Sequence, residues 1–450
     1  MSRAHQLKIS VSGIRGVVGD FLTPNLACAF AQAFGTYVGP GPVVIGRDTR
    51  ASGEMLEHAV TCGLLAAGCE VIKVGIAPTP TIQVYVAEIR ACGGIAVTAS
   101  HNPPEYNALK LFNREGLFFN HYERTELLDL YHQSEFRQAT NDGIRRVSSD
   151  TETPPRRHFA RVLAHVDVEK IRARKFRVAL DGVNGAGSVM SVQFLRDVLG
   201  CEVHAISVDP TKPFPREAEP KPEVLGDLQA LIRSSKADIA FAQDPDGDRL
   251  AVGDETGRIL DNDDVLALAV DCALGKRQGP VVVNLTTSAV IDDVAARHGC
   301  RVFRAPVGEA NVVERMKAVS AVIGGEGSNG GIIFPAVQYC RDSYLGMAFL
   351  LERLAETGST MSELAATLPR YHRRLGKMAF QHGRLGTMMQ ALETLFPGAK
   401  ADRTDGLKLC LEEGWIHVRA SNTEPLLRIA AEARTPEMLE ELYRKAESVG

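Results

Sequence analysis

Three copies of one local pattern constrain the fold of this chain more than any other feature. In residues 43–74, 177–204 and 281–303, a buried strand is followed by a helix, a Gly-Cys pair and a second strand. In each copy the glycine stands where a helix commonly ends, because glycine accepts the left-handed backbone of a C-cap. The copies begin more than a hundred residues apart, which is typical of repeated domains and not of a solenoid. The pattern therefore predicts three related α/β domains.

The length of 450 residues allows three or four domains. Changes in composition place the boundaries, and we predict domains at 1–150, 151–254, 255–370 and 371–450. The polar segment 141–155 ends in two prolines and is expected to be a linker. The last domain differs in kind, because its apolar pattern predicts a hairpin, a further strand and a closing helix. The predicted fold class is α/β, with three related α/β domains and a smaller C-terminal α+β domain.

A short acidic loop gives the clearest chemical signal. Asp244, Asp246 and Asp248 alternate with proline and glycine, so that their carboxylates can converge on one hard cation. Like charges this close are unfavourable unless a cation neutralises them. The flanking segments are predicted strands, and Arg249 stands where an EF-hand requires glycine, so a Mg²⁺ site of an α/β enzyme is favoured. Arg249 is expected to orient the metal ligands or to contact phosphate.

A second loop carries a hydroxyl nucleophile. The predicted strand 93–98 ends just before Ser100 and His101, and two prolines follow at 103–104. We expect Ser100 and His101 to lie on a rigid, exposed loop at the carboxyl edge of a sheet, where ligands bind in α/β folds. With Lys110 ten residues further on, this set suits phosphoryl chemistry. From these residues alone, a plain loop with local side-chain caps is an equal alternative.

Three further segments suit a phosphorylated sugar. Arg15, between two glycines, is expected to project from a turn toward phosphate. The glycine-rich stretch after residue 323 lacks the Lys-Ser/Thr of a P-loop, and its Glu326 and Ser328 suit sugar hydroxyls. Residues 419–423, with Arg428 nearby, could form a phosphate cradle. Flexible loops and capped turns remain the alternatives for these segments.

Charge and cysteine usage exclude several classes of protein. The net charge of −4 and pI of about 6.3 argue against a general nucleic-acid or membrane binder. Nine cysteines are scattered without a Cys-x-x-Cys pair, which argues against zinc and for reduced thiols. The N-terminus lacks the apolar core of a signal peptide, and no apolar run approaches the roughly 18 residues of a membrane span. The expected location is cytoplasmic.

Together these motifs resemble the α-D-phosphohexomutase superfamily of phosphoglucomutases, phosphomannomutases and phosphoglucosamine mutases. The resemblance covers the whole chain, and its motifs occur in the family's order at Thr98–Pro103, Asp244–Arg249, Gly325–Ser328 and Arg419–Thr423. It implies four domains around a central cleft and a phosphoserine at position 100. It further implies one Mg²⁺ held by the three aspartates and a phosphate oxygen on Ser100, and a hexose 1,6-bisphosphate as both intermediate and activator.

The motifs and the resemblance assign roles to individual residues. The resemblance implies that Ser100 carries the phosphoryl group, that Arg15 and Lys110 flank it, and that either Lys110 or His101 is the acid/base. The predicted catalytic residues are Ser100, His101, Lys110, Arg15 and Arg249. The predicted metal ligands are Ser100, Asp244, Asp246 and Asp248. The predicted substrate-binding residues are Glu326, Ser328, Asn329, Arg419, Ser421, Asn422, Thr423 and Arg428.

The sugar-binding segment departs from two branches of the superfamily. Gly-Glu-Gly-Ser-Asn-Gly-Gly at 325–331 has neither the Met of the glucose/mannose branch nor the Gln of the bacterial glucosamine branch, and it lacks the His of both. It is more similar to the loop of archaeal-type glucosamine-phosphate enzymes, and either Ser328 or Asn329 aligns with the family serine. Glu309 likewise stands where the glucose/mannose enzymes often have His.

Glucosamine phosphate is therefore the narrow favourite substrate over glucose and mannose phosphates. We expect the enzyme to be a monomer or homodimer that binds a small sugar phosphate. A non-catalytic sugar-phosphate sensor is an alternative from another class. A Mg²⁺-dependent sugar phosphatase is a third, although such an enzyme would more naturally use an aspartate nucleophile than Ser100.

Overall fold

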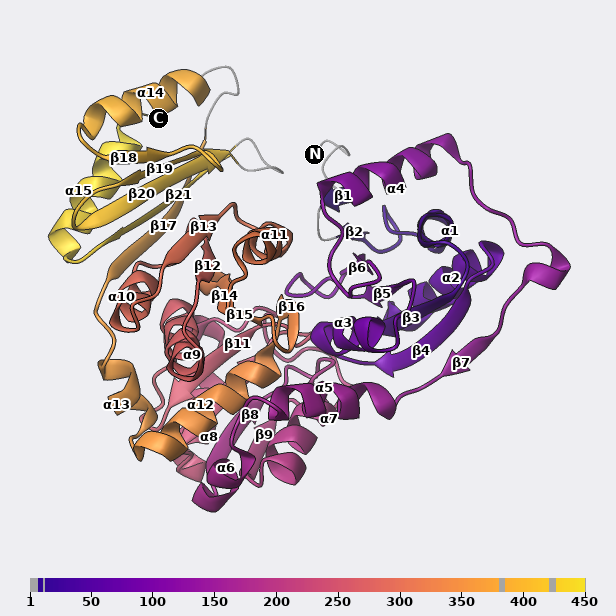
Figure 1. The fold of residues 1–450 in the computed structure, drawn as a ribbon, viewed down its shortest axis with the longest axis horizontal. Coiled ribbons are helices and arrows are strands. Elements are labelled where there is room, and N and C mark those ends of the chain that lie inside the picture. Colours follow the sequence, from indigo (N-terminus) through magenta and orange to yellow (C-terminus); the bar gives the residue numbers. More distant parts are fainter. Residues whose placement is uncertain (1–6, 11–12, 380–384, 421–425, 450) are drawn as a thin grey trace.

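The computed structural model describes residues 7–10, 13–379, 385–420 and 426–449. Four sheets follow one another along the chain, and each is built from its own part of the sequence. In Figure 1 the N-terminal sheet lies on the right, the second below, the third at the centre left and the C-terminal sheet at the upper left. The predicted class, three α/β domains followed by a smaller α+β domain, is confirmed.

The first domain is a seven-stranded sheet in the order β1-β2-β6-β5-β3-β4-β7. Its strands are β1 (Leu7–Ser10), β2 (Gly13–Val17), β3 (Pro42–Arg47), β4 (Glu70–Ile76), β5 (Gly93–Val97), β6 (Tyr106–Phe112) and β7 (Val147–Ser149). Its helices are α1 (Pro24–Val38), α2 (Gly53–Ala66), α3 (Thr79–Glu88) and α4 (His121–Gln133).

Residues 141–155, which were expected to be a linker before the second domain, contain regular secondary structure. Within this polar segment, β7 pairs in parallel with β4 and completes the edge of the first sheet. The helix α5 (Thr153–Leu163) begins at its two prolines, with proline in the first turn. Proline fits there because the first N–H groups of a helix have no partner inside it. The polar composition reflects an exposed edge strand, since all three residues of β7 are exposed.

The second and third domains contain the other two copies of the repeat. The second has α5, α6 (Val168–Arg174), α7 (Ser188–Gln193), α8 (Gly226–Ser235), β8 (Arg177–Asp181), β9 (Glu202–Ile206), β10 (Ile239–Gln243) and β11 (Leu250–Asp254). The third has the strands β12 (Val281–Asn284), β13 (Val302–Ala305), β14 (Ile323–Glu326), β15 (Gly331–Phe334) and β16 (Gln338–Arg341). Its helices are α9 (Asn262–Lys276), α10 (Val290–Arg297), α11 (Glu309–Val319), α12 (Ser343–Thr357) and α13 (Met361–Ala366).

The repeated unit is present in all three domains. The strand pairs β3/β4, β8/β9 and β12/β13 are parallel, and each pair is joined through a helix. In the second copy, α7 continues into a π-helical turn, Phe194–Val198. The capping glycines Gly68, Gly200 and Gly299 have φ values of 75°, 72° and 67°, in the left-handed region. A glycine at the end of each helix therefore turns the chain into the next strand.

The C-terminal domain is antiparallel throughout its described part. Its elements are β17 (His372–Ala379), α14 (Leu385–Leu395), β18 (Lys400–Asp402), β19 (Leu407–Cys410), β20 (Gly414–Ala420), β21 (Leu426–Ala433) and α15 (Pro436–Glu447). The predicted hairpin is β19–β20, and Thr435 caps the closing helix as expected, its hydroxyl accepting from the Met438 N–H.

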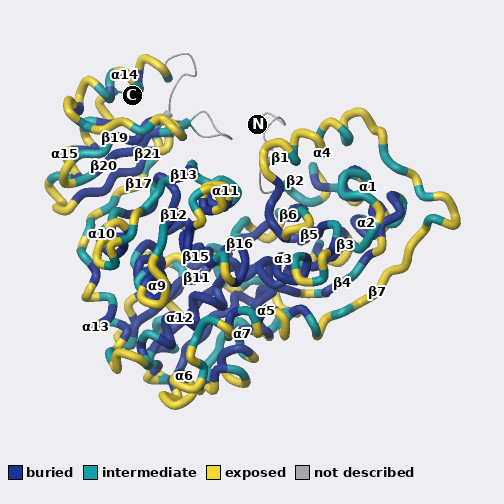
Figure 2. The backbone as a smooth tube through the Cα atoms, viewed as in Figure 1, coloured by how far each residue is buried: buried dark blue, intermediate teal, exposed yellow. Residues whose placement is uncertain are grey.

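Burial shows how the domains are joined (Figure 2). Buried apolar residues of the second and third domains form one continuous core, whereas the C-terminal domain has a core of its own. The buried His158 of α5 links three domains: its Nδ1 lies 2.9 Å from Thr81 Oγ1, and its Nε2 lies 2.9 Å from Asp342 Oδ2. The first three domains thus form a closely packed base.

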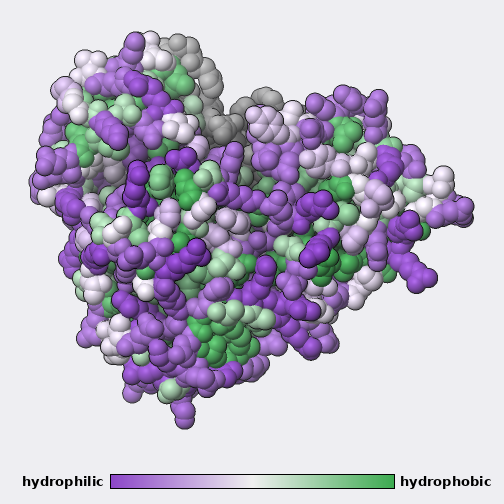
Figure 3. Space-filling view, viewed as in Figure 1, coloured by the Kyte–Doolittle hydropathy of each residue, from purple (hydrophilic) through white to green (hydrophobic). Residues whose placement is uncertain are grey.

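The C-terminal domain contacts the third domain through polar groups. Lys408 Nζ donates to the Leu285 carbonyl oxygen (2.6 Å), Arg373 donates to the Thr286 carbonyl oxygen (2.9 Å), and Glu432 accepts from the Ala289 N–H (2.7 Å). The molecular face in Figure 3 is mostly hydrophilic, with apolar side chains in small groups. Across the described ranges, every helix is too short or too polar to cross a bilayer.

Candidate active site

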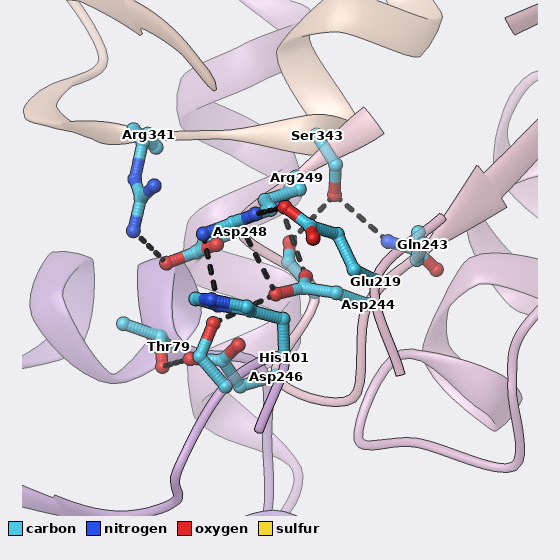
Figure 4. Close-up of polar contacts among 12 residues, drawn as sticks. Thr79, His101, Glu219, Gln243, Asp244, Asp246, Asp248, Arg249, Arg341 and Ser343 are labelled. Carbon is cyan, nitrogen blue, oxygen red and sulfur yellow. Dashed lines mark hydrogen bonds and ion pairs between the residues drawn. The ribbon is translucent and has the colours of Figure 1, made fainter. Parts of the chain in front are cut away.

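Three aspartates meet on the loop between β10 and β11 (Figure 4). Asp244, Asp246 and Asp248 are each at most 1% exposed, and one oxygen of each lies within 4.8 Å of the others. The two flanking strands pair antiparallel, which confirms the predicted strand–loop–strand setting. Because this loop joins two adjacent strands, the alternating carboxylates project together from its tight turn.

Cations and a hydroxyl group from the other domains hold one side of this triad. Asp246 Oδ2 accepts from Thr79 Oγ1 (2.6 Å) and from Lys110 Nζ (2.5 Å). Asp248 Oδ2 accepts from Arg341 Nη2 (2.7 Å) and from Lys110 Nζ (3.3 Å). The Oδ1 atoms of Asp246 and Asp248 are buried and find no hydrogen-bond partner among the described residues. This all-carboxylate set with two unpartnered oxygens fits a hard divalent cation.

The pKa values of Asp244 and Asp246 are shifted in opposite directions. Burial, reinforced by the charges of Asp246 and Asp248, raises the pKa of Asp244 well above its ordinary value. Burial also acts to raise the pKa of Asp246, but the Lys110 ammonium beside it lowers that pKa overall. Without a cation, Asp244 therefore holds a proton more readily than Asp246 does.

Ser100 lies against the triad. Its Oγ donates to Asp244 Oδ2 at 2.9 Å, and the residue is only 2% exposed. The prediction that Ser100 itself is exposed is therefore wrong, because the acidic loop of the second domain covers the end of β5, whereas residues 103–105 of the same loop are exposed. Ser100 has a φ of 51°, a left-handed conformation that costs a non-glycine residue about 1–2 kcal/mol. Such strain persists only where surrounding contacts fix the backbone.

Arg50 supplies those contacts, and the sequence reasoning missed it. Its guanidinium donates to the carbonyl oxygens of Ser100 and Asn102 (both 2.7 Å), Pro103 (2.6 Å) and Tyr106 (3.0 Å). Its Nε also donates to the buried Asp48 carboxylate (3.0 Å). Arg50 thus fixes the backbone on both sides of Ser100. An Asp-x-Arg pair directly after a buried strand was the available signal.

Arg15 also reaches the serine loop, although from a strand. It lies in β2, opposite Ala108 of β6, so the prediction that it projects from a turn is wrong. Gly13 begins this strand with a φ of 111°, and a Cβ there would meet the Leu109 carbonyl oxygen at 1.9 Å. Glycine at this position therefore permits the close approach of β2 to β6. Arg15 Nη1 donates to Asn102 Oδ1 at 2.6 Å.

His101 and Arg249 form a pair across the first two domains. Arg249 Nη2 donates to His101 Nδ1 (2.9 Å), while Nη1 donates to Glu219 (2.5 Å). Burial, together with the charges of Arg249 and Arg15, lowers the pKa of His101 to about 2. The imidazole is therefore neutral, with Nδ1 as an acceptor and the proton on Nε2. Lys110, by contrast, is charged, because its two aspartate partners outweigh burial and raise its pKa.

The predicted sugar-binding residues lie on the third domain. Glu326 ends β14, and its Oε1 accepts from Asn284 Nδ2 (3.0 Å) and from the Gly308 N–H (2.8 Å). Ser328 follows on a single 3₁₀ turn and is partly exposed. The side chain of Asn329 lies outside the described set. Arg341 Nη1 lies 3.9 Å from Glu326 Oε2, which brings this segment close to the triad.

The predicted phosphate-binding residues of the C-terminal domain are described only in part. Arg419 of β20 and Arg428 of β21 are directly paired in the sheet. Directly opposed residues project from the same face, so the two guanidinium groups belong to one side of this domain. Ser421, Asn422 and Thr423 lie outside the described residues.

Each domain matches a domain of one family of sugar-phosphate enzymes. The phosphoglucomutase/phosphomannomutase α/β/α domains I, II and III match residues 6–138, 156–257 and 261–371, and the C-terminal domain matches residues 388–447. These four matches, in the family's order, define a phosphosugar mutase, an isomerase. The chain belongs to the phosphoglucomutase/phosphomannomutase family.

Known proteins are similar to this chain in sequence or structure over nearly its full length. A phosphoglucomutase/phosphomannomutase of Thermococcus kodakarensis is 38% identical over 437 residues, which cover 95% of each chain. A Methanopyrus kandleri protein named probable phosphoglucosamine mutase is 38% identical over 435 residues, covering 96% of this chain and 95% of its own. The crystal structure of a Burkholderia thailandensis phosphoglucomutase/phosphomannomutase family protein has a TM-score of 0.85 at 26% identity, covering 98% and 97% of the two chains.

Proposed function

We propose that the protein interconverts hexose 6-phosphate and hexose 1-phosphate through a phosphorylated Ser100, with glucosamine phosphate as the preferred sugar. One observation carries this proposal: the Ser100 hydroxyl lies 2.9 Å from Asp244 in a buried acid triad. A phosphoryl group on Ser100 would therefore stand beside three carboxylates, with Lys110 and Arg249 close by. Such a group is strongly anionic and needs those cations and a metal ion to be stable there.

The triad would hold Mg²⁺ through Asp244, Asp246 and Asp248, with a phosphate oxygen on Ser100 as a further ligand. The unpartnered Oδ1 atoms of Asp246 and Asp248 support this assignment. When bound, Mg²⁺ supplies electrostatic stabilisation of the phosphoryl group during transfer. Lys110 and Arg341 keep the other oxygen of Asp248 occupied, so that this carboxylate keeps one orientation.

Both half-reactions use Ser100, which is the leaving group in the first and the nucleophile in the second. In the first, the Ser100 Oγ–P bond breaks, a bond from phosphorus to the sugar hydroxyl oxygen forms, and the sugar becomes a 1,6-bisphosphate. In the second, the other phosphoryl group returns to Ser100, which releases the isomeric monophosphate. The candidates for acid and base are Lys110 and His101: the charged Lys110 can donate a proton but not accept one, whereas the neutral His101 can accept one. Added hexose 1,6-bisphosphate would act as activator by phosphorylating any free Ser100.

Residues on the remaining two domains would hold the sugar phosphate. Glu326 and Ser328 suit the hydroxyl groups, because Glu326 Oε1 is already fixed by Asn284 and its second oxygen remains for other partners. Arg419 and Arg428 suit the phosphate that is not reacting, since paired guanidinium groups bind phosphate strongly.

The choice of sugar rests on the relatives and on the segment 325–331. Several of the similar curated proteins carry the name probable phosphoglucosamine mutase, and the segment lacks the Met and the His that the glucose/mannose branch usually has. A hexose mutase acting on glucose or mannose phosphates is the second candidate. It is favoured by the Thermococcus kodakarensis relative, which is named phosphoglucomutase/phosphomannomutase.

The test compares wild type, Ser100→Ala and Ser234→Ala, an exposed serine of α8, as the matched control. Coupled assays use glucosamine 6-phosphate, mannose 6-phosphate or glucose 6-phosphate, each with Mg²⁺ and a trace of the matching bisphosphate. We expect only the Ser100 variant to be inactive. Intact-mass measurement should find a phosphoryl group on wild type and on Ser234→Ala but not on Ser100→Ala. Normal turnover in Ser100→Ala would refute the mechanism. Preference for glucose or mannose would favour the second candidate, and inactivity on all three sugars would favour a sensor.

A further inference from the structure

Arg341, which no sequence motif indicated, contacts carboxylates from three separate segments. It ends β16 and is 8% exposed. Its Nη2 donates to Asp248 Oδ2 on the metal loop (2.7 Å), and its Nε donates to Glu309 Oε2 at the start of α11 (2.8 Å). Its Nη1 lies 3.9 Å from Glu326 Oε2 on the sugar segment. Arg341 is thus a direct link between the metal loop and the sugar segment.

The three contacts are unequal. Asp248 and Glu309 hold Arg341 at hydrogen-bond distance, whereas the Glu326 pair is longer than a hydrogen bond. Burial acts to lower the pKa of Arg341, but Asp248, Glu309 and Glu326 raise it well above its ordinary value. The guanidinium therefore stays charged, and it is shared among competing acceptors in a site where charges are weakly screened.

The two carboxylate oxygens of Asp248 have different surroundings. Its Oδ2 holds Arg341 and Lys110, while its Oδ1 is buried without a partner among the described residues. When Asp248 gives Oδ1 to a divalent cation, less negative charge remains on Oδ2 to hold Arg341. The Nε–Glu309 bond still anchors the guanidinium, so its Nη1 end is free to close on Glu326. A planar guanidinium can exchange partners in this way without leaving its anchor.

We propose that Arg341 is a positioning residue that couples cation binding at Asp248 to the orientation of Glu326, so that the sugar segment is completed after the metal loop is occupied. This inference rests on the proposed metal site but not on the identity of the sugar. It gives the enzyme an order of events, in which the second oxygen of Glu326, Oε2, is fixed only when the metal loop is occupied, whereas Oε1 is already held by Asn284 and Gly308.

The test measures amide hydrogen exchange with and without Mg²⁺, in the absence of any sugar. In wild type we expect Mg²⁺ to slow exchange both in residues 244–250 and in residues 323–328, the latter by about fivefold or more if the coupling is of ordinary size. In Arg341→Lys the charge remains but the fork is lost, so only residues 244–250 should respond. Arg353→Lys is the matched control, because Arg353 pairs with Asp271 on the same domain (2.9 Å) and touches none of the three carboxylates in the described structure.

A second variant keeps the proposal testable if Arg341→Lys folds poorly. Glu309→Gln removes the anchoring charge and leaves the metal ligands in place, so it should shrink the response of residues 323–328 while residues 244–250 respond normally. The coupling would be overturned if Mg²⁺ slowed exchange in residues 323–328 of both variants as much as it does in the wild-type protein. It would also be overturned if, in the wild-type protein, Mg²⁺ slowed exchange only in residues 244–250. No wild-type response at 244–250 would instead refute the metal site, and with it the proposed mechanism.

Discussion

Replacing Arg50 by methionine tests whether one buried guanidinium holds the nucleophile in place. Methionine keeps the length and apolar stem of the side chain but removes four bonds to carbonyl oxygens and the ion pair with Asp48. Breaking a buried ion pair by removing one partner costs about 3–5 kcal/mol, because the other charge is left uncompensated. The four hydrogen bonds to carbonyl oxygens lie in the same network as the Asp48 ion pair, so their energies do not simply add to its cost. We therefore expect the local free energy of unfolding around Ser100 to fall by about 3–5 kcal/mol.

The same change should affect catalysis more than it affects the fold of the other domains. Ser100 keeps its left-handed φ of 51° because the backbone on both sides is fixed. Once released, Ser100 can relax away from Asp244, and a shift of about 1 Å lowers turnover roughly a hundredfold. We therefore expect kcat to fall far more than KM rises, because the residues proposed to bind the sugar lie on other domains.

The assay combines native-state hydrogen exchange with steady-state kinetics. A four-domain chain does not unfold in two states, so local exchange free energies of the amides in β3, β5 and β6 replace a single unfolding curve. Arg156→Met is the control, because its ion pair with Glu152 is exposed and contributes about 0–1 kcal/mol. Exchange free energies within about 1 kcal/mol of wild type, with near-normal kcat, would refute the role assigned to Arg50.

Two further predictions concern buried charges. Burial, together with the charge of the nearby Arg304, lowers the pKa of Lys408 to about 7. Between pH 7 and about 10, Lys408 is therefore protonated in the unfolded chain but neutral in the folded protein. The free energy of unfolding should consequently rise with pH in this range, by up to roughly 1.4 kcal/mol per pH unit. Hydrogen-exchange free energies of the amides in β19 and β20 should show this rise in wild type and its loss in Lys408→Met, and equal pH dependence in both would contradict it. Asp244→Asn should leave the metal-free protein about as stable as wild type, because burial and the neighbouring aspartates raise the pKa of Asp244 and so disfavour its charged form. Exchange free energies of the amides in β10 and β11 should show Mg²⁺ stabilising wild type by about 2.7 kcal/mol at a hundred times Kd but not the variant. Stabilisation of both would contradict the assignment.

Local signals explain how much of the fold could be predicted. Each α/β unit can be predicted from about thirty consecutive residues, because these contain a buried strand, an amphipathic helix and a capping glycine such as Gly68. The acidic loop was equally readable, since Asp244, Asp246 and Asp248 lie on one turn and no distant residue is needed to bring them together. The antiparallel C-terminal domain followed from the β19–β20 hairpin and the cap at Thr435.

The predictions that were wrong all concern contacts between distant segments. Ser100 was expected to be exposed because prolines follow it, but the loop that buries it comes from another domain. Arg15 was assigned to a turn because of its glycines, whereas Gly13 serves a close approach to β6. The strand β7 was hidden by its polar sequence, since an edge strand needs only a neighbour such as β4. Pattern alone does not reveal which neighbour a segment will have.

The charge balance of the site could not be read from the sequence for the same reason. The three carboxylates belong to the second domain, yet Lys110 comes from the first and Arg341 from the third. Neither cation is close to the acidic loop in sequence, and each is buried only because the domains meet there. A rigid junction, such as the one His158 makes with Thr81 and Asp342, is therefore a condition of the chemistry. If the domains separated at this point, the aspartates would lose their neutralising charges before any metal or substrate could bind.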